Sequence, residues 1–536
     1  MKNKKKIIKL LIFSHNNNYN IKIYNNISNN LKKKIKITNI ISIDNSNLEN
    51  LKLNFKEAKI VLLKDLTKKN FLIQDEIIVD NKIIKKYKDC EFMFYKMLDF
   101  VKLNNEYFKK NEKKYTYKYY LKIIINFLKT NKIDMVFFSH VPHSFFDVLF
   151  IQICKLNKIK ILFTRAYLLP GFYLFEKDLF STSLKKKKIK TYKNINPGIL
   201  EFFDDAKNKF DLKNIKKNVW VDYSLIDRMV KVKSKVELFY LEFLFLKTIK
   251  YFLRNFLILS KLTKLFIFDL FKNNNFFSFK NYYFISDFHK KKNTSLMESK
   301  LNKFSLEKIY LKTDIDKFNL LKFYLQLSSK PNLKEHYIFF PLWFQPSSTT
   351  YPFAGNNIDY LKCIKLLSKS LPKSWKIYVK ESPDIFNMNK HAWFKGTFVR
   401  NKNFYLKLKK IKNVKLVNFD VPDFKLIDYA IATATQADKF GLISVIRNKP
   451  NINFSNSIQK YCHGTFICKN SIELKKSIYK IKRGFKIDKK KVNLFFSILS
   501  SELFYRETIK GFNKYESRTD YSKISKLLES KIFESF

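Results

Sequence analysis

A short run of titratable residues offers acid–base chemistry. Positions 139–147 read Ser-His-Val-Pro-His-Ser-Phe-Phe-Asp, which places His143 and Asp147 four residues apart. Residues four apart on a helix lie on the same face, and an imidazole beside a carboxylate can exchange protons near neutral pH. The same spacing also suits a plainer role, in which both residues cap and charge the start of a helix. We take His143 and Asp147 as candidate catalytic residues and keep the capping role as the alternative.

A second candidate lies at the end of a predicted strand, in the segment Tyr378-Val379-Lys380-Glu381-Ser382-Pro383. Lys380 or Ser382 could reach an anionic ligand beyond the strand. Glu381 could accept hydrogen bonds from sugar hydroxyls or hold Lys380. An ordinary strand exit followed by a proline turn is the alternative.

The third candidate is a strand–loop–helix unit in Ala434–Pro450, with Thr435 at the strand end and Gly441 near the helix start. Free N–H groups and the helix dipole at such a position suit a diphosphate, and a glycine permits close backbone approach. The loop matches neither a dinucleotide-binding nor a P-loop motif, and Asp438 would repel a phosphate beside it.

Alternating strands and helices must position these residues. The first part of the chain predicts strands separated by helices, which is typical of a parallel sheet covered on both faces. Its predicted strands are Ile7–Phe13, Ala58–Leu63, Ile133–Ser139 and Lys158–Thr164, and its predicted helices are Phe92–Thr130 and Phe145–Leu156.

The same alternation returns after Pro331. The predicted strands here are 337–342, 376–380, 414–419, 431–435 and 451–454, with helices over 358–370, 404–411 and 423–429 and from Gly441 onward. We therefore predict an α/β protein with two Rossmann-like domains facing a cleft, because ligands of open α/β sheets bind outside the carboxyl ends of the strands.

The predicted domains are an N-terminal acceptor-side domain (1–169), a mostly helical, basic, Phe-rich middle (170–330), a C-terminal nucleotide-sugar-side domain (331–482) and a helical tail (483–536). The amphipathic stretch Val236–Phe271 within the middle is expected to bridge the two domains. Contact with a membrane surface is the alternative.

The amino-acid composition narrows the classes of function that the chain can have. Lys and Arg number 105 against 46 acidic residues, a net charge of +59. Only eight of the basic residues are Arg, whereas a protein built to grip phosphates and guanines favours Arg. We expect lysine-rich solvated faces and no nucleic-acid role. Five scattered cysteines indicate a reducing compartment, and no apolar run reaches the roughly 18 residues of a membrane span, so a cytoplasmic protein is expected.

Taken together, several segments resemble the bacterial capsule and surface polysaccharide biosynthesis proteins, which have a GT-B glycosyltransferase architecture. The segments that carry the resemblance are FFPLWFQPSSTTYPFAG (339–355), LPKSWKIYVKESP (371–383), KNFYLKLKKIKNVKLV (402–417), LIDYAIATAT, GLISVIRNKPNINF and, more loosely, VPHSFFD and PGFY (170–173). The resemblance implies transfer of a sugar from a nucleotide donor to a polysaccharide or lipid-linked glycan at the cytoplasmic membrane face, without a metal or cofactor. It places Lys380, Glu381, Ser382, Thr435 and Gly441 on the donor side.

The chain departs from the family at four polar positions. Trp343 and Ser382 stand where the family has His, Ser347 stands where it has Glu, and Ile443 replaces the acidic residue of the helix. Because tryptophan and serine cannot relay protons as imidazole does, two hypotheses remain open. The protein is a divergent glycosyltransferase, or it is a catalytically inactive homologue that acts as a binding or scaffolding subunit.

Overall fold

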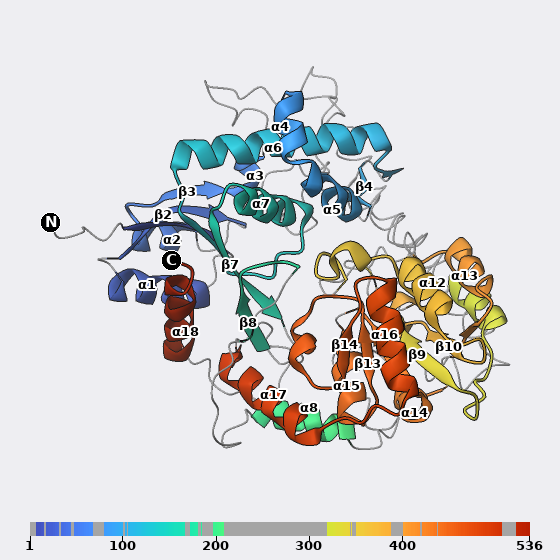
Figure 1. The fold of residues 1–536 in the computed structure, drawn as a ribbon. Helices are drawn as coiled ribbons and strands as arrows, with labels where there is room; N and C mark the ends of the chain where they lie inside the picture. Colours follow the sequence, from blue (N-terminus) through green and yellow to red (C-terminus); the bar gives the residue numbers. More distant parts are fainter. Residues whose placement is uncertain are drawn as a thin grey trace, which may run out of the picture.

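A computed structural model describes residues 7–14, 18–31, 34–43, 48–67, 80–99, 102–103, 106–166, 172–180, 184, 197–207, 319–343, 345, 350–386, 400–418, 421–436, 438–505 and 521–536. The stretch Val236–Phe271 lies outside these residues, as do the first six residues and Ser347. The described chain forms two α/β units that lie side by side (Figure 1).

The first unit is built on a mostly parallel sheet. Its seven described strands lie in the order β15-β8-β7-β6-β1-β2-β3, and β8 runs antiparallel to both of its neighbours. The strands are β1 (Ile8–Ser14), β2 (Ile35–Ser42), β3 (Lys59–Leu62), β6 (Met135–Phe138), β7 (Lys160–Ala166), β8 (Phe172–Glu176) and β15 (Phe504–Tyr505). Apolar runs such as Leu10–Phe13 are buried on both faces because helices cover both sides of the sheet.

Two groups of helices cover the first sheet. One face packs on α5 (Lys88–Leu98), α6 (Lys110–Asn131) and α7 (Phe145–Leu156). The other packs on α1 (Asn18–Asn30), α2 (Leu48–Asn54) and α18 (Tyr521–Phe533). The short elements α3 (Leu63–Leu66), α4 (Asn81–Lys86), β4 (Lys102–Leu103) and β5 (Glu106–Tyr107) lie among the connections. The single helix predicted over Phe92–Thr130 was wrong, because it divides into α5 and α6.

The second unit has a fully parallel sheet of six described strands, in the order β11-β10-β9-β12-β13-β14. They are β9 (Tyr337–Pro341), β10 (Lys376–Lys380), β11 (Val414–Leu416), β12 (Ala432–Thr435), β13 (Asn451–Asn453) and β14 (Thr465–Ile467). All five strands predicted after Pro331 are present, and β14 is an additional one.

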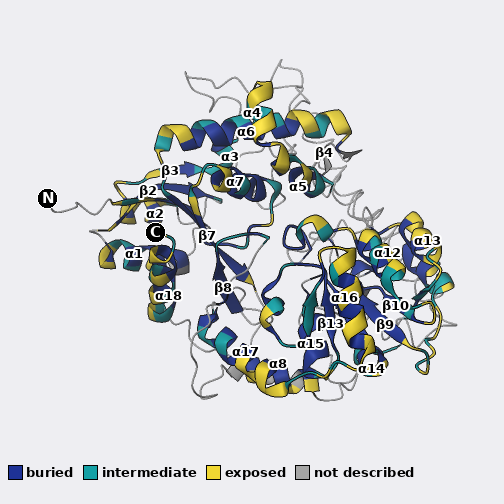
Figure 2. Cartoon of the chain, in the orientation of Figure 1, coloured by how far each residue is buried: buried dark blue, intermediate teal, exposed yellow. Residues whose placement is uncertain are grey.

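Helices also cover both faces of the second sheet, and Figure 2 shows their outer surfaces exposed over buried strands. One face carries α12 (Tyr360–Ser370), α13 (Lys402–Lys409), α16 (Ser471–Lys482) and the helical residues 319–327. The other carries α8 (Pro197–Lys207), α14 (Asp423–Tyr429), α15 (Phe440–Ile446) and α17 (Lys489–Glu502). The α/β fold class with two Rossmann-like units is confirmed.

Each sheet has a point where the strand order reverses. The chain leaves the first sheet's centre at β1 toward β2 and β3, and then returns to β6 and β7 on the other side of β1. The second sheet does the same, with β10 and β11 on one side of β9 and β12 to β14 on the other. Ligands of open α/β sheets bind at the carboxyl ends of the strands at such switch points.

Two connections join the units. After α17 packs on the second sheet, β15 pairs with the edge strand β8 of the first sheet, and α18 then packs against α1. In the other direction, residues 351–358 leave the carboxyl end of β9 and join the core of the first unit. There the ring of Phe353 stacks on Phe163, with 6.2 Å between centroids, and the Arg165 guanidinium lies 3.9 Å from the Phe353 centroid.

Candidate functional site

The first switch point brings His140 and Asp147 together. His140 follows β6, and its Nε2 lies 3.2 Å from the Asp147 carboxylate; both residues are buried. Asp147 also forms a capping box at the start of α7, in which its backbone N–H donates to Ser144 Oγ and its carboxylate accepts the Ser144 N–H. Burial opposes ionisation, but His140, His143 and Ser144 outweigh it and hold the pKa of Asp147 below its ordinary value.

His143 lies outside the helix. The helix α7 begins at Phe145, so the spacing of four residues between His143 and Asp147 does not place them on one helical face. The exposed His143 ring instead contacts the Val141 carbonyl at 2.6 Å through Nδ1. The expected geometry of this pair was therefore wrong, because Ser144 ends the loop and caps the helix. His140, which the sequence analysis passed over, is the imidazole in contact with Asp147.

The second switch point is built on a buried ion pair. Arg400 Nε donates to Glu381 Oε2 at 2.8 Å, and both side chains have no exposed surface. The Tyr405 hydroxyl donates to the same carboxylate oxygen, and the Ser382 N–H donates to the other oxygen at 2.9 Å. Burial raises the pKa of Glu381 against the opposing effect of Arg400 and Tyr405.

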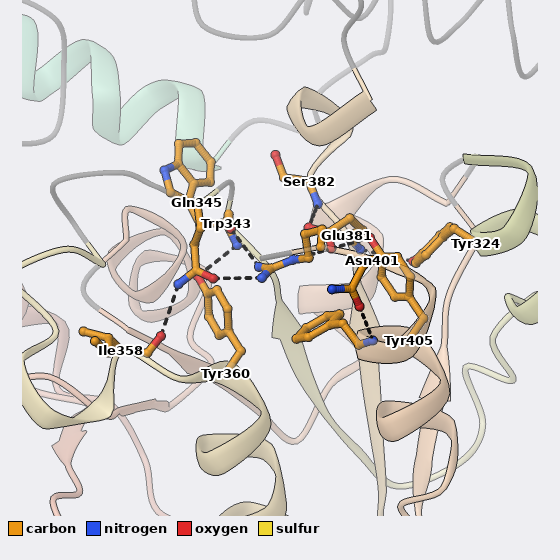
Figure 3. Close-up of polar contacts among 11 residues, drawn as sticks. Tyr324, Trp343, Gln345, Ile358, Tyr360, Glu381, Ser382, Asn401 and Tyr405 are labelled. Carbon is orange, nitrogen blue, oxygen red and sulfur yellow. Dashed lines mark hydrogen bonds and ion pairs between the residues drawn. The ribbon is translucent and has the colours of Figure 1, made fainter. Parts of the chain in front are cut away.

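Arg400 extends this cluster to the loop after β9, whose residues Trp343 and Gln345 are labelled in Figure 3. Its Nη1 donates to Gln345 Oε1 at 2.8 Å and its Nη2 donates to the Trp343 carbonyl at 3.3 Å. The guanidinium also packs on two aromatic rings, 4.9 Å from the Tyr360 centroid and 4.5 Å from that of Phe404. One arginine therefore joins the loops that follow β9 and β10, which no sequence motif indicated.

Lys380 lies beside this cluster but points elsewhere. Successive side chains of a strand point to opposite faces, so Glu381 meets Arg400 while Lys380 turns toward the loop after β11. Its buried ammonium donates to the Val421 carbonyl at 2.7 Å and pairs with Asp423 at 2.9 Å. The expected contact in which Glu381 holds Lys380 is replaced by two ion pairs, Glu381 with Arg400 and Lys380 with Asp423.

Gly441 serves close packing. A Cβ atom at this position would lie 2.4 Å from Asn451 Nδ2 and 2.4 Å from Gln459 Oε1. Thr435, at the end of β12, is also buried and donates to Asn451 Oδ1 at 3.0 Å. The α15 helix spans seven residues, all buried.

Asp438 occupies the start of α15. Its carboxylate accepts the Phe440 N–H at 2.9 Å and the Gln436 N–H at 3.4 Å, and the residue is 2% exposed. Burial raises the pKa of Asp438 to about 6, against the opposing effect of these backbone bonds and of Lys439. A carboxyl group thus takes the N–H groups that the sequence analysis assigned to a phosphate.

The raised pKa of Asp438 predicts a pH-dependent stability. Because the folded pKa of about 6 exceeds the unfolded value of 3.8, folding favours the neutral acid, and stability is lost as the pH rises through 6. We expect the free energy of unfolding of Asp438→Asn, relative to that of the parent chain, to rise by about 1 kcal/mol between pH 5 and pH 7.5. Urea unfolding of both proteins at the two pH values measures this, and parallel pH profiles would contradict it.

The described residues contain no group of three or more His, Cys, Asp and Glu side chains placed to hold a metal ion. Within the same part of the chain, no helix is long and apolar enough to cross a membrane.

Comparisons with known proteins identify similar solved structures. No family model matches the chain, and no curated protein matches it. The chain is similar to KpsC of Thermosulfurimonas dismutans, a beta Kdo 2,7 transferase, with 15% identity and a TM-score of 0.22; the match covers 42% of this chain and 66% of KpsC. The UDP-GlcNAc 2-epimerase of Methanocaldococcus jannaschii shares 12% identity with a TM-score of 0.22, covering 92% and 99% of the two chains.

A glycosyltransferase from Rickettsia africae is a third similar structure, with 9% identity and a TM-score of 0.21 over 99% of each chain. The neighbours thus include glycosyltransferases and an epimerase. At identities of 15% or less and TM-scores of 0.22 or less, these likenesses assign no function to this chain.

Proposed function

We propose that the protein transfers a sugar from a nucleotide-sugar donor to a growing capsule or surface polysaccharide. The observation that carries the proposal is the second switch point, where residues following β9, β10 and β12 meet on a buried framework. The strand order β11-β10-β9-β12-β13-β14 is that of the dinucleotide-binding fold. The resemblance of the same segments to capsule biosynthesis proteins supports this choice.

All five donor-side residues are buried, and their contacts divide them into two roles in this proposal. Lys380 holds the loop after β11 beside the donor through its ion pair with Asp423, and Ser382 supplies a hydroxyl at the end of β10. The other three residues support the loops and do not touch the donor. Glu381 contacts Arg400, Thr435 contacts Asn451, and Gly441 lets α15 pack closely. They hold the loops in place for the donor.

Acceptor activation is assigned to the first switch point. Asp147 is an ionised carboxylate, consistent with its lowered pKa, and it can orient a neighbouring imidazole for proton transfer. His143, exposed and close by, is the imidazole able to meet an acceptor hydroxyl, while buried His140 positions Asp147. The acceptor in this proposal is a polysaccharide or lipid-linked glycan at the inner face of the plasma membrane, which the protein contacts peripherally.

The test is binding and transfer with purified chain. Calorimetry against a panel of nucleotide sugars should give selective binding of one nucleotide class, weakened at least tenfold in Lys380→Met. Lys376→Met is the matched control, because Lys376 lies at the amino end of the strand whose carboxyl end is Lys380. His143→Gln should retain donor binding and lose transfer. Full transfer by both His143→Gln and Lys380→Met would overturn the proposal.

A second candidate function is an inactive subunit of a polysaccharide assembly complex. The Asp438 carboxylate at the start of α15 favours it, because a negative charge there competes with a donor phosphate. A folded chain that binds no nucleotide sugar and purifies with a transferase at fixed stoichiometry would support this alternative.

A further inference from the structure

An aromatic ring and a cation meet at the second switch point. Trp343 follows β9 and Lys439 follows β12, the two neighbouring strands between which the chain reverses its order. The Lys439 ammonium lies 5.7 Å from the centroid of the Trp343 ring, and the Phe440 ring packs edge-on at 6.0 Å. This is the place where an open α/β sheet binds its ligand.

The backbone of Trp343 is held on both sides. Its N–H donates to the Tyr360 hydroxyl at 3.1 Å, and its carbonyl accepts from Arg400 at 3.3 Å. Tyr360 and Arg400 are at most 1% exposed, whereas Trp343 is partly exposed. A partly exposed indole therefore sits on a fully buried support, which fixes it before any ligand arrives.

The Ser382 hydroxyl faces the same way as the Trp343 indole. In Figure 3 the indole of Trp343 and the hydroxyl of Ser382 extend to one side of the cluster, away from Tyr405. An indole offers a broad apolar face on which bases and sugar rings stack. The Lys439 ammonium, which lies over this ring, can pair with a phosphate or carboxylate.

We propose that Trp343 stacks on the ring of a bound anionic ligand and that Lys439 pairs with the ligand's phosphate. The inference rests on the proposed function and adds to it the residues that hold the ring of the nucleotide donor. Arg400 acts in this site as a positioning residue, through the Trp343 carbonyl. A surface cation–π pair with no ligand is the competing explanation.

The experiment measures binding of uridine diphosphate, cytidine monophosphate and the ringless anion pyrophosphate by calorimetry. Trp343→Leu should weaken binding of the nucleotides about tenfold, the usual size of a lost base stack, and leave pyrophosphate unchanged. Lys439→Gln should weaken all the probes that bind. Nucleotide should also quench the tryptophan fluorescence of Trp375→Phe and fail to quench that of Trp343→Phe. Trp375 is the matched control because it directly precedes β10, at the amino ends of the strands and away from the proposed site.

Each outcome supports or overturns the stacking site at Trp343. Nucleotide binding of unchanged affinity in Trp343→Leu overturns the stacking site and leaves the transferase proposal standing. Nucleotide binding that depends on Trp343, in a chain that transfers no sugar from any donor, supports the site and rejects the transferase. Absence of binding by folded parent chain overturns both.

Discussion

Replacing Arg400 by methionine is expected to lower the free energy of unfolding by about 3–5 kcal/mol, because it leaves the buried Glu381 carboxylate without its counter-charge. Gln345 and the Trp343 carbonyl lose a donor in the same step. Urea unfolding followed by circular dichroism measures the loss. The deficit should be smaller at pH 5 than at pH 8, because the pKa of Glu381 is already raised and an unpaired carboxyl can take up a proton.

Two controls separate the buried pair from ordinary surface charge. Lys415→Met breaks the ion pair with Glu335 on the same sheet, but these side chains are 41% and 28% exposed, so at most about 1 kcal/mol is expected. Adding Glu381→Gln to Arg400→Met should restore part of the stability, because the uncompensated charge is removed. Equal losses for Arg400→Met and Lys415→Met would contradict the described geometry.

Replacing Gly441 by alanine is expected to cost roughly 1–3 kcal/mol, although alanine is the better helix former by about 1 kcal/mol. The added Cβ would lie 2.4 Å from the side-chain amides of Asn451 and Gln459, so either these hydrogen-bonded amides or α15 must shift. Thermal or urea unfolding measures the effect, and Gly441→Val should be worse than Gly441→Ala.

Ser444→Ala is the control on the same helix, because it adds no atoms and removes one bond to the Phe440 carbonyl. It should cost less than about 1.5 kcal/mol. A Gly441→Ala protein as stable as the parent would mean that α15 does not pack against β12 and β13 as described.

The fold was predictable wherever strands were short apolar runs between turn residues. Strands such as 133–139 and 376–380 satisfy both conditions and lie where predicted. By contrast, β2 carries Lys36, Thr38 and Asn39 within its span, so its polar content hid it. The strand β8 pairs with β7 directly before it and with β15 far along the chain, and the second pairing could not be predicted from sequence.

The location of the candidate site residues in the fold was predictable from the sequence, but the side chains that they contact were not. The residues after β6, β10 and β12 do lie at the switch points, because topology alone brings strand ends together. The contacts between side chains depend on the residue at which a helix begins. Ser144 caps α7, so the helix begins after His143. Arg400 follows no motif, yet an arginine in so lysine-rich a chain was a signal, since burial with bidentate or stacked partners favours guanidinium.

The return of the chain to the first sheet has a consequence for synthesis. The edge strand β8 ends at Glu176 and its partner β15 begins at Phe504, so 327 residues separate them. At about 5–20 residues per second, a ribosome needs roughly 16–65 s to reach the missing strand, and the helix α18 follows it. During that interval the nascent first unit presents an unpaired β8 edge and the apolar face that α18 later covers. The order of translation therefore makes the second unit the first that can be completed, and leaves the first unit with an exposed strand edge until synthesis is nearly finished.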